Sequence, residues 1–444
     1  ANSDVVAAPR ENIERIRKRD VTLRVLDAGG EPLAGHDVEV VLTRHAFCFG
    51  DQLWPLDRMV RFGSDRTDRG RYWKLRFCDA LNAANALCYW TERPRSDGPK
   101  TEDVQGFPRL DGFHACVDWA ASAGLTVKGH PLVWSIPKCV PQWVMRYDYE
   151  TQMKFLEVRV RQLIASVAGR VRIWDLVNEA LWEPAWKNLP NRRWPHIEDI
   201  EDIADYIAPA VRWARSEDPN ACYLINDYGL AADKTLDGEP LKAADGTVVT
   251  AAMQRQRLLQ LVRVLGERGC PPGGIGLQSH TGGWVPPAQQ TAVYDEMSEA
   301  GLPVHITEFS APTRDLRAAG ELSEEQIDRL QAEYVGNYLT VAFGHPGIEA
   351  FFFWGFMGQA VRFRGETSGH ELTPLYETVR RLIREQWTTR QRLTTDERGQ
   401  GSFRGFLGDY ALRWRLAERQ TCGVRFRVAP EQTMPLTLTA RPIV

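Results

Sequence analysis

The feature that most constrains the fold is a series of short apolar runs, each of strand length, along the middle of the chain. Amphipathic stretches of helical length separate many of these runs, at 112–123, 149–167, 200–216, 251–268, 289–300 and 324–343. Hydrophobic strands that alternate with helices are typical of a parallel sheet covered by helices. The runs therefore predict an α/β fold, a closed (β/α)8 TIM barrel over residues 46–388. They lie at 46–50, 78–84, 125–132, 171–177, 222–226, 275–278, 304–307 and 350–354.

The two ends of the chain follow a different pattern. Residues 21–26 and 36–42 alternate around Asp27-Ala28-Gly29-Gly30, which predicts a β-hairpin. Residues 405–416, 422–428 and 434–440 are also short and β-like. Because domain termini usually lie close together, we expect segments 1–45 and 389–444 to form one small β-sandwich-like accessory domain. The two roles open to it are packing against the barrel, which we favour, and sugar binding.

Composition and charge limit the kinds of partner that the protein is expected to bind. The net charge of −3 and the absence of basic runs argue against nucleic acid, and no apolar stretch of about 18 residues is present to span a membrane. Fifteen tryptophans fit either a sugar cleft, where indoles stack on pyranose faces, or a Trp-rich core. The sequence does not indicate an oligomeric state.

The eight cysteines are scattered, without a C-x-x-C motif or a Cys/His cluster, so we expect no structural zinc. Cys48 and Cys222 lie in apolar runs and are expected to be buried free thiols. No H-E-x-x-H spacing occurs, and no metal or cofactor is predicted. The chain opens without Met, which is consistent with a processed form, and a polymeric substrate would place the protein in a secreted or periplasmic location.

Carboxyl side chains end two of the apolar runs. Catalytic residues of such barrels lie at the carboxyl ends of the strands. Glu179 follows Asn178 at the end of the fourth run, and Glu308 ends the seventh. Two carboxyls at one rim can flank a glycosidic bond, and a retaining mechanism needs them about 5–5.5 Å apart. We predict that Glu179 is a protonated acid/base and that Glu308 is an ionised nucleophile.

Further polar and aromatic side chains stand at other strand ends. We expect His280 to orient Glu308 by a hydrogen bond, and Asn178 to bind the hydroxyl beside the reacting carbon. Asp175 and Asp227 are expected to hold neighbouring side chains in place. The other residues at these ends are His130, Trp134, Tyr228, Gln278 and Trp354.

These motifs together resemble glycoside hydrolase family 10, whose best-known members are endo-β-1,4-xylanases. Residues 174–179 are similar to the family's acid/base motif and residues 306–308 to its nucleophile motif, with residues 129–134, 225–228 and 276–280 matching in order. The resemblance implies retaining hydrolysis of xylan or a related plant-wall glycan through a covalent glycosyl-enzyme, with no metal or cofactor. It also implies substrate contacts from Asn85, His130, Trp134, Asn178, Gln278, His280 and Trp354.

The chain departs from the family where the distal sugar of the glycone side is held. The family's Glu-Asn-x-x-Lys-Trp reads Ala84-Asn85-Ala86-Leu87-Cys88-Tyr89 here, and Ser135 and Ser310 replace a His and an acid. Losing two charged hydrogen-bonding groups removes roughly 1.5–3 kcal/mol each. We therefore expect weak activity on plain linear xylan and better activity on another β-linked or decorated glycan.

Two alternatives stay open on the sequence. One is a retaining glycosidase of the same fold with non-xylan specificity, acting on a β-glucoside or a decorated glycan. The other is a catalytically silent carbohydrate-binding protein, although both glutamates and Asn178 are present.

Overall fold

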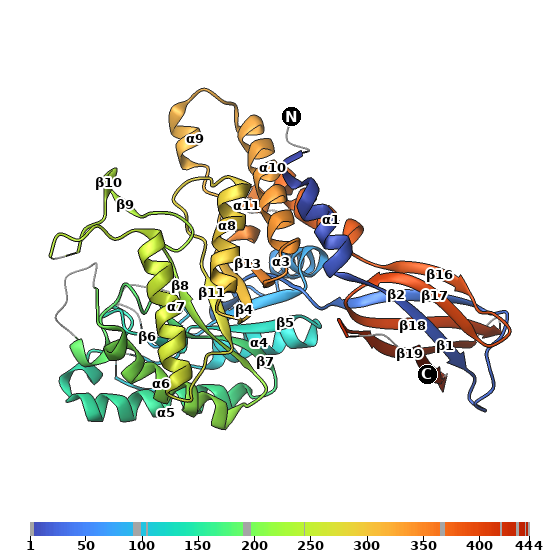
Figure 1. The fold of residues 1–444 in the computed structure, drawn as a ribbon, viewed down its shortest axis with the longest axis horizontal. Helices are drawn as coiled ribbons and strands as arrows, with labels where there is room; N and C mark the ends of the chain where they lie inside the picture. The colour runs from blue at the N-terminus through green and yellow to red at the C-terminus, as the bar shows by residue number, and fades with distance from the viewer. Residues whose placement is uncertain are drawn as a thin grey trace.

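The computed structural model describes residues 4–91, 99–103, 105–189, 197–243, 245–364, 369–417, 420–431, 435–439 and 441–442. Eight parallel strands form a closed ring, because β5 pairs with both β4 and β7, and β13 pairs with β3 (Figure 1). The predicted (β/α)8 barrel is confirmed. Its strands are β3 (Cys48–Gln52), β4 (Ala83–Leu87), β5 (Thr126–His130), β7 (Val171–Asn178), β8 (Cys222–Asp227), β11 (Gly274–Leu277), β12 (Val304–Phe309) and β13 (Ile348–Phe353).

Helices surround this ring, and several begin at a side chain that caps the first turn. Asp148 caps α5 and Thr250 caps α7, while Ser323 and Gln326 form a capping box at the start of α10. The helical ranges expected at 149–167 and 324–343 agree with α5 and α10. The larger helices are α2 (Trp54–Arg61), α3 (Asp68–Ala80), α4 (Asp111–Ser122), α5 (Tyr149–Val167), α6 (Ile200–Glu217), α7 (Ala251–Glu267), α8 (Pro287–Ser298), α10 (Glu324–Phe343) and α12 (Pro374–Arg381).

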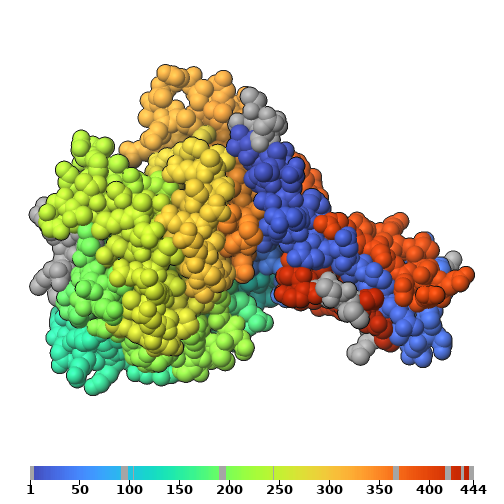
Figure 2. Space-filling view, viewed as in Figure 1, coloured from blue at the N-terminus to red at the C-terminus, as the bar shows by residue number. Residues whose placement is uncertain are grey.

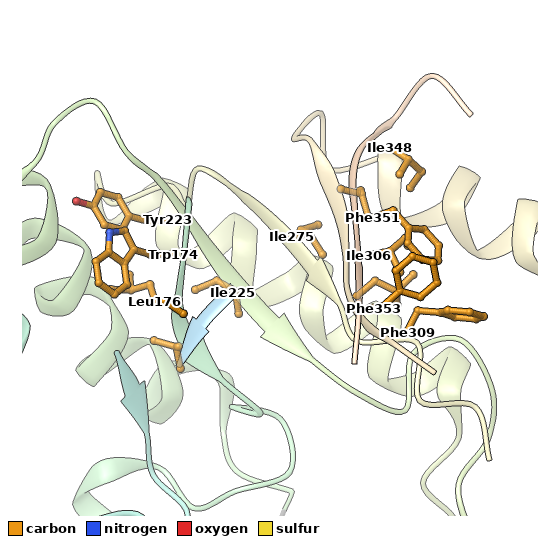
Figure 3. Packing of buried hydrophobic residues seen from close by; sticks show 14 of the residues in the cluster. Trp174, Leu176, Tyr223, Ile225, Ile275, Ile306, Phe309, Ile348, Phe351 and Phe353 are labelled. Carbon is orange, nitrogen blue, oxygen red and sulfur yellow. The ribbon is translucent and has the colours of Figure 1, made fainter. Parts of the chain in front are cut away.

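Alternate residues of each strand face opposite sides of the barrel wall. The outward set packs against the helices, as Trp174, Ile306 and Phe351 show in Figure 3. The inward set forms a small apolar layer that includes Ala83, Leu224 and Phe352. The layer is tightly filled, since a Cβ on Gly50 would lie 2.4 Å from the Phe352 ring. Above this layer, buried polar side chains such as Lys128 and Asp175 lead toward the carboxyl ends of the strands.

The second strand lies later than the sequence run predicts. Residues 78–80 form the last turn of α3, and β4 begins at Ala83. Phe77 and Ala80 are buried on the inner face of that helix, so the apolar run mixes helix and strand. Asn82 separates the two, bonding the backbone of Phe47 and Phe49. A short apolar run does not distinguish these two structures, and the predicted strand 78–84 is wrong at its start.

Strands from both ends of the chain form two sheets beside the barrel, the separate lobe of Figure 2. Val21, Leu23 and Val25 from one sheet share a core with Val40 and Leu412 from the other, which makes a sandwich. One sheet has the order β17–β1–β20 and the other the order β16–β2–β18–β19–β21. Their bounds are β1 (Lys18–Leu26), β2 (Asp37–His45), β16 (Arg390–Thr394), β17 (Gln400–Phe406), β18 (Gly408–Ala417), β19 (Gln420–Val428), β20 (Leu436–Thr439) and β21 (Arg441–Pro442).

The predicted hairpin between residues 21–26 and 36–42 is wrong. The tight turn exists, with the Gly30 N–H donating to the Asp27 carbonyl at 3.1 Å, but the chain then crosses to the other sheet. Strand β1 pairs with β17 and β20, and β2 pairs with β16 and β18, so neither has a free edge for the other. The limits 1–45 and 389–444 stay a prediction, and α1 (Ala7–Ile16) packs on α10 of the barrel.

All eight cysteines are free thiols, with Cys48 buried and Cys222 half-buried. Among the described residues, no helix combines the length and the apolar character that a membrane crossing requires.

Candidate active site

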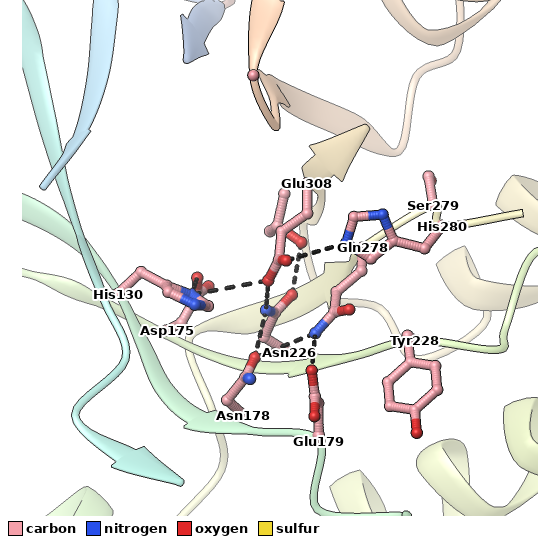
Figure 4. A network of polar contacts seen from close by, with 12 residues as sticks. His130, Asp175, Asn178, Glu179, Asn226, Tyr228, Gln278, Ser279, His280 and Glu308 are labelled. Atoms are coloured by element: carbon pink, nitrogen blue, oxygen red, sulfur yellow. Dashed lines mark hydrogen bonds and ion pairs between the residues drawn. The ribbon is translucent and has the colours of Figure 1, made fainter. Parts of the chain in front are cut away.

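Many of the predicted site residues meet at the carboxyl ends of the barrel strands, and Figure 4 shows those around the two glutamates. Most of their side chains are buried, and hydrogen bonds connect them across four strands. Each comes from a different place in the wall: His130 ends β5, Asn178 ends β7, Gln278 follows β11, and Glu308 lies in β12.

Three neighbours surround the Glu308 carboxylate. The Asn226 amide donates to its Oε1 at 2.9 Å, and His280 Nε2 lies 3.1 Å from its Oε2. His130 Nδ1 is 3.7 Å from Oε1. Burial by itself would raise the pKa of Glu308, but the two imidazoles outweigh it and hold that pKa below its usual value. The carboxylate is therefore ionised, and the expected hydrogen bond from His280 is present.

Glu179 stands in the opposite environment. Its backbone has a φ of 59°, a left-handed conformation uncommon for a glutamate, and its N–H donates to the Asn226 carbonyl at 2.8 Å. The carboxyl receives Trp134 Nε1 at 3.1 Å and Gln278 Nε2 at 3.2 Å. Burial, and then repulsion by Glu308, raises the pKa of Glu179 to about 7. Near pH 6 one carboxyl is thus protonated and the other is charged.

A relay of amides connects the two carboxyls. Asn178 Oδ1 accepts from Gln278 Nε2 at 3.1 Å and from Asn226 Nδ2 at 2.8 Å. Since Asn226 Oδ1 accepts from the Thr307 hydroxyl, its NH2 group faces Glu308. Gly276 makes room for this amide, because a Cβ there would lie 2.4 Å from Asn226 Oδ1. Asn226 was not among the predicted contacts, although its inward register beside Asn178 would have indicated it.

A second missed residue is Lys128, which forms a fully buried ion pair with Asp175, a residue expected to hold neighbouring side chains in place. The same Asp175 oxygen accepts from His130 Nδ1 at 2.7 Å, which fixes the imidazole beside Glu308. Burial opposes ionisation of Asp175, but Lys128 and His130 lower its pKa overall. His130, Asp175 and Glu308 offer donor atoms within 4.8 Å of one another. Within this group, Asp175 is already paired with the Lys128 ammonium.

Aromatic rings border the carboxyls. Tyr89 lies 5.7 Å from Trp134 and 5.9 Å from His130 between ring centroids, and Trp354 lies 5.2 Å from His130. On the other side of Glu179, Tyr228 stacks on Trp182 at 4.9 Å. The predicted contacts Trp134, Tyr228 and Trp354 are all half-buried, and Trp134 donates to Glu179 while Trp354 packs beside His130.

Asn85 points into the barrel but stands apart from the amide relay. Its side chain is fully buried, and neither its oxygen nor its nitrogen has a hydrogen-bond partner among the described residues. The neighbouring Ala84 and Cys88 belong to the outer core, and the Cys88 thiol faces the Pro131 carbonyl. Residues 84–89 therefore present no charged group to the cleft, and the Asn85 amide offers polar atoms inside the barrel.

Glu183 is a third carboxyl beside the pair. It follows Glu179 by one helical turn, its N–H donating to the Glu179 carbonyl at 3.0 Å. Burial, and then the charge of Glu179, raises the pKa of Glu183 to about 8, while Lys138 opposes the change. Glu183 was not among the predicted site residues, although it lies four residues after Glu179 in the sequence.

Comparison with known proteins gives one family and several relatives. The model of Glycosyl hydrolase family 10 matches residues 99–375. The chain is 28% identical over 407 residues to anti-sigma-I factor RsgI6 of Acetivibrio thermocellus, covering 90% of this chain and 45% of that protein. It is 24% identical over 408 residues to endo-1,4-beta-xylanase 1 of Arabidopsis thaliana, covering 91% and 37%. The chain thus spans less than half the length of these two relatives.

Among solved structures, the chain is similar to xylanase 10B from Thermotoga petrophila RKU-1, with a TM-score of 0.54 and 19% identity. The match covers 77% of this chain and 95% of that one. At this identity the likeness establishes the barrel fold alone.

Proposed function

Because the chain belongs to glycosyl hydrolase family 10, we propose that it is a retaining β-glycoside hydrolase, endo-1,4-β-xylanase-like, acting on xylan or a related plant-wall polysaccharide. One observation supports this most strongly. Two carboxyls at one rim have opposed environments, with the pKa of Glu179 raised to about 7 and that of Glu308 lowered. Such a pair supplies an acid and a nucleophile at the same pH.

In the first step, Glu308 attacks the anomeric carbon while the glycosidic C–O bond breaks. Glu179 gives its proton to the leaving oxygen, and the glycone remains as an ester of Glu308. Esterification removes the negative charge that repelled Glu179, so the pKa of Glu179 falls. In the second step, Glu179 takes a proton from water, whose oxygen attacks the same carbon and releases Glu308.

The amides and imidazoles keep these roles separate. His130 and His280 hold Glu308 ionised, and Asn226 holds the same carboxylate at its Oε1. The side-chain oxygen of Asn178 already accepts two hydrogen bonds. Its NH2 group is therefore the part of the side chain that can bind a sugar hydroxyl. Hydrogen bonds to the hydroxyl beside the reacting carbon strengthen in the oxocarbenium-ion-like transition state.

We further propose that the substrate is decorated or otherwise differs from plain linear xylan. The support is the glycone side of the cleft, where aromatic rings and the single amide of Asn85 stand in place of a charged clamp. An uncompensated buried amide of this kind suits a sugar hydroxyl. Rings without charged neighbours hold a sugar mainly by stacking.

The test compares kcat/KM on linear xylan, arabinoxylan, glucuronoxylan and aryl β-glycosides, with the anomer of the first product recorded by NMR. We expect a β product first, loss of turnover in Glu308→Ala, and lower kcat/KM on linear xylan than on a decorated one. An α product would contradict the retaining mechanism. Ordinary xylanase efficiency on unsubstituted xylooligosaccharides would contradict the altered clamp.

The similarity to anti-sigma-I factor RsgI6 favours a second candidate, glycan recognition by a barrel that forms part of a regulatory protein. Binding and hydrolysis use the same cleft, so turnover separates them. Glycan binding by the wild-type chain without release of reducing sugar would support recognition alone.

A further inference from the structure

A pocket of about 1040 Å³ opens at the rim of the barrel, between the segments that follow β3 and β13. Its lining comes from α2, from the start of α3, from α11 (Phe356–Ala360) and from β14 (Val361–Arg364), which forms a hairpin with β15 (Gly369–Leu372). Trp54 joins this pocket to the cleft. Its indole lines the pocket, and its centroid lies 6.1 Å from Tyr89, which packs on Trp134.

The pocket is positively charged. Three arginines line it, and none of the described residues that line it is an aspartate or a glutamate. Arg362 is neutralised by Asp328 through two hydrogen bonds of 2.6 and 2.7 Å. Arg58 and Arg69 have no carboxylate within 4.0 Å among the described residues, and each lies over a ring instead. Two guanidinium groups are therefore available to an anion from solution.

The same pocket offers surfaces that suit a sugar. Trp54, Phe62, Trp73 and Phe363 contribute rings to its wall, and Phe62 is 66% exposed. The Arg69 guanidinium lies 4.3 Å from the centroid of the Phe363 ring, which holds the planar cation beside an apolar face. Aromatic faces stack on pyranose rings, and arginine binds carboxylates in a bidentate manner. The combination fits a sugar that carries a carboxylate.

The position of the pocket sets which part of the substrate reaches it. Glu179 directly follows β7, and in the proposed mechanism its proton goes to the leaving group, so the aglycone lies on that side. The pocket adjoins β3 and β13, where Trp354 and Trp54 stand, across the barrel mouth from β7 and β8. It therefore meets the glycone side, next to the place where the charged clamp is missing.

We propose that this pocket binds a uronic acid branch on the glycone part of the substrate, with Arg58 and Arg69 pairing its carboxylate and Phe363 and Trp54 packing on its ring. The inference rests on the proposed glycosidase function and names the decoration. It also explains how the glycone is held without the family's charged clamp, since a branch contact replaces a contact to the main chain.

The test uses two branched xylooligosaccharides that differ in one group: the uronic acid branch, and the same branch with its carboxyl reduced to an alcohol. We expect the wild type to have a kcat/KM roughly tenfold higher for the acidic one, as charge-assisted hydrogen bonds at an exposed site imply. Arg58→Gln combined with Arg69→Gln should bring the ratio close to one. Arg66→Gln, which removes a neighbouring exposed charge outside the pocket, should keep the ratio.

Binding provides a readout that does not depend on turnover. Calorimetry with Glu308→Ala should give tighter binding of the acidic oligosaccharide than of the reduced one, and adding the two arginine substitutions should remove the difference. Equal binding of both sugars, or a preference that survives the double substitution, would overturn the pocket assignment. Selective binding without any turnover by the wild type would instead support the pocket and contradict the hydrolase.

Discussion

Replacing Glu308 by Gln should lower the pKa of Glu179 without returning it to an ordinary value. The substitution keeps the size of the side chain and removes its negative charge. Burial is the larger cause of the raised pKa of Glu179, and repulsion by Glu308 is the second. Only the second cause disappears in the variant, so the pKa should fall below about 7 and stay above 4.5.

The size of the effect follows from the same values. A pKa raised from 4.5 to about 7 corresponds to about 3 kcal/mol of preference for the neutral acid, at about 1.36 kcal/mol per pKa unit. Because the Glu179 carboxyl partly faces the cleft, this figure is an upper bound. In Glu308→Gln, the part of this preference that comes from repulsion by Glu308, which is the smaller part, should disappear. The hydrogen bond from Gln278, which favours the charged form, remains in both proteins.

The assay is a carbon-13 NMR titration of glutamate carboxyls, with Glu179→Gln to assign the resonance. The wild-type kcat/KM should also fall above pH 7, where Glu179 loses its proton, and below the usual range of a glutamate, where Glu308 gains one. An unchanged pKa in Glu308→Gln would refute the repulsion between the two groups. A fall all the way to 4.5 would refute the role of burial.

Three further substitutions test the groups that hold this pair. Gly276→Ala places a Cβ 2.4 Å from Asn226 Oδ1. This variant should lower kcat on the order of 100-fold with a small change in Tm. An unaltered kcat would show that Asn226 does not position Glu308. Trp134→Phe keeps a ring but removes the donor to Glu179, and should lower kcat about 2- to 10-fold, which initial rates on an aryl glycoside would measure. Lys128→Met leaves Asp175 buried and charged, and should lower the free energy of unfolding by about 3–5 kcal/mol at pH 7.

The loss of unfolding free energy in Lys128→Met should depend on pH, and its direction follows from the pKa of Asp175. The lowered pKa of Asp175 stabilises the wild type above the carboxyl's unfolded pKa, and that stability is lost as pH falls through the folded value. In Lys128→Met the pKa of Asp175 rises, so urea denaturation should show a deficit that shrinks toward acid pH. An equal deficit at pH 4 and pH 7 would point to packing rather than charge.

The barrel and its rim were accessible from sequence because strand-length apolar runs end in polar residues at fixed places. Glu179 directly follows β7 and Glu308 lies one residue before the end of β12, and both reach the same network. The pairing of the strands at the two ends of the chain was harder to predict from the sequence. A turn at Asp27–Gly30 looks the same whether the next strand pairs with the first or enters another sheet, and only the partners of β1 and β2 decide between these.

The missed residues share a physical reason. A lysine in a strand usually reaches solvent, and only the facing Asp175 makes Lys128 a stable interior cation. Asn226 acquires its role from Thr307 and Gly276, which lie 81 and 50 residues away in the chain. The basic pocket depends on α2, α3 and β14 meeting at one rim, and no local pattern indicates that meeting.

The most direct test of the central claim is to trap the glycosyl-enzyme with an activated 2-deoxy-2-fluoro β-xylobioside and to find the labelled peptide by mass spectrometry. Glu308 should carry the fluoroglycosyl group in a one-to-one ratio, and turnover should stop as the label accumulates. A label on any other residue, or continued turnover of an activated xyloside by Glu308→Ala, would contradict the assignment of Glu308 as the nucleophile.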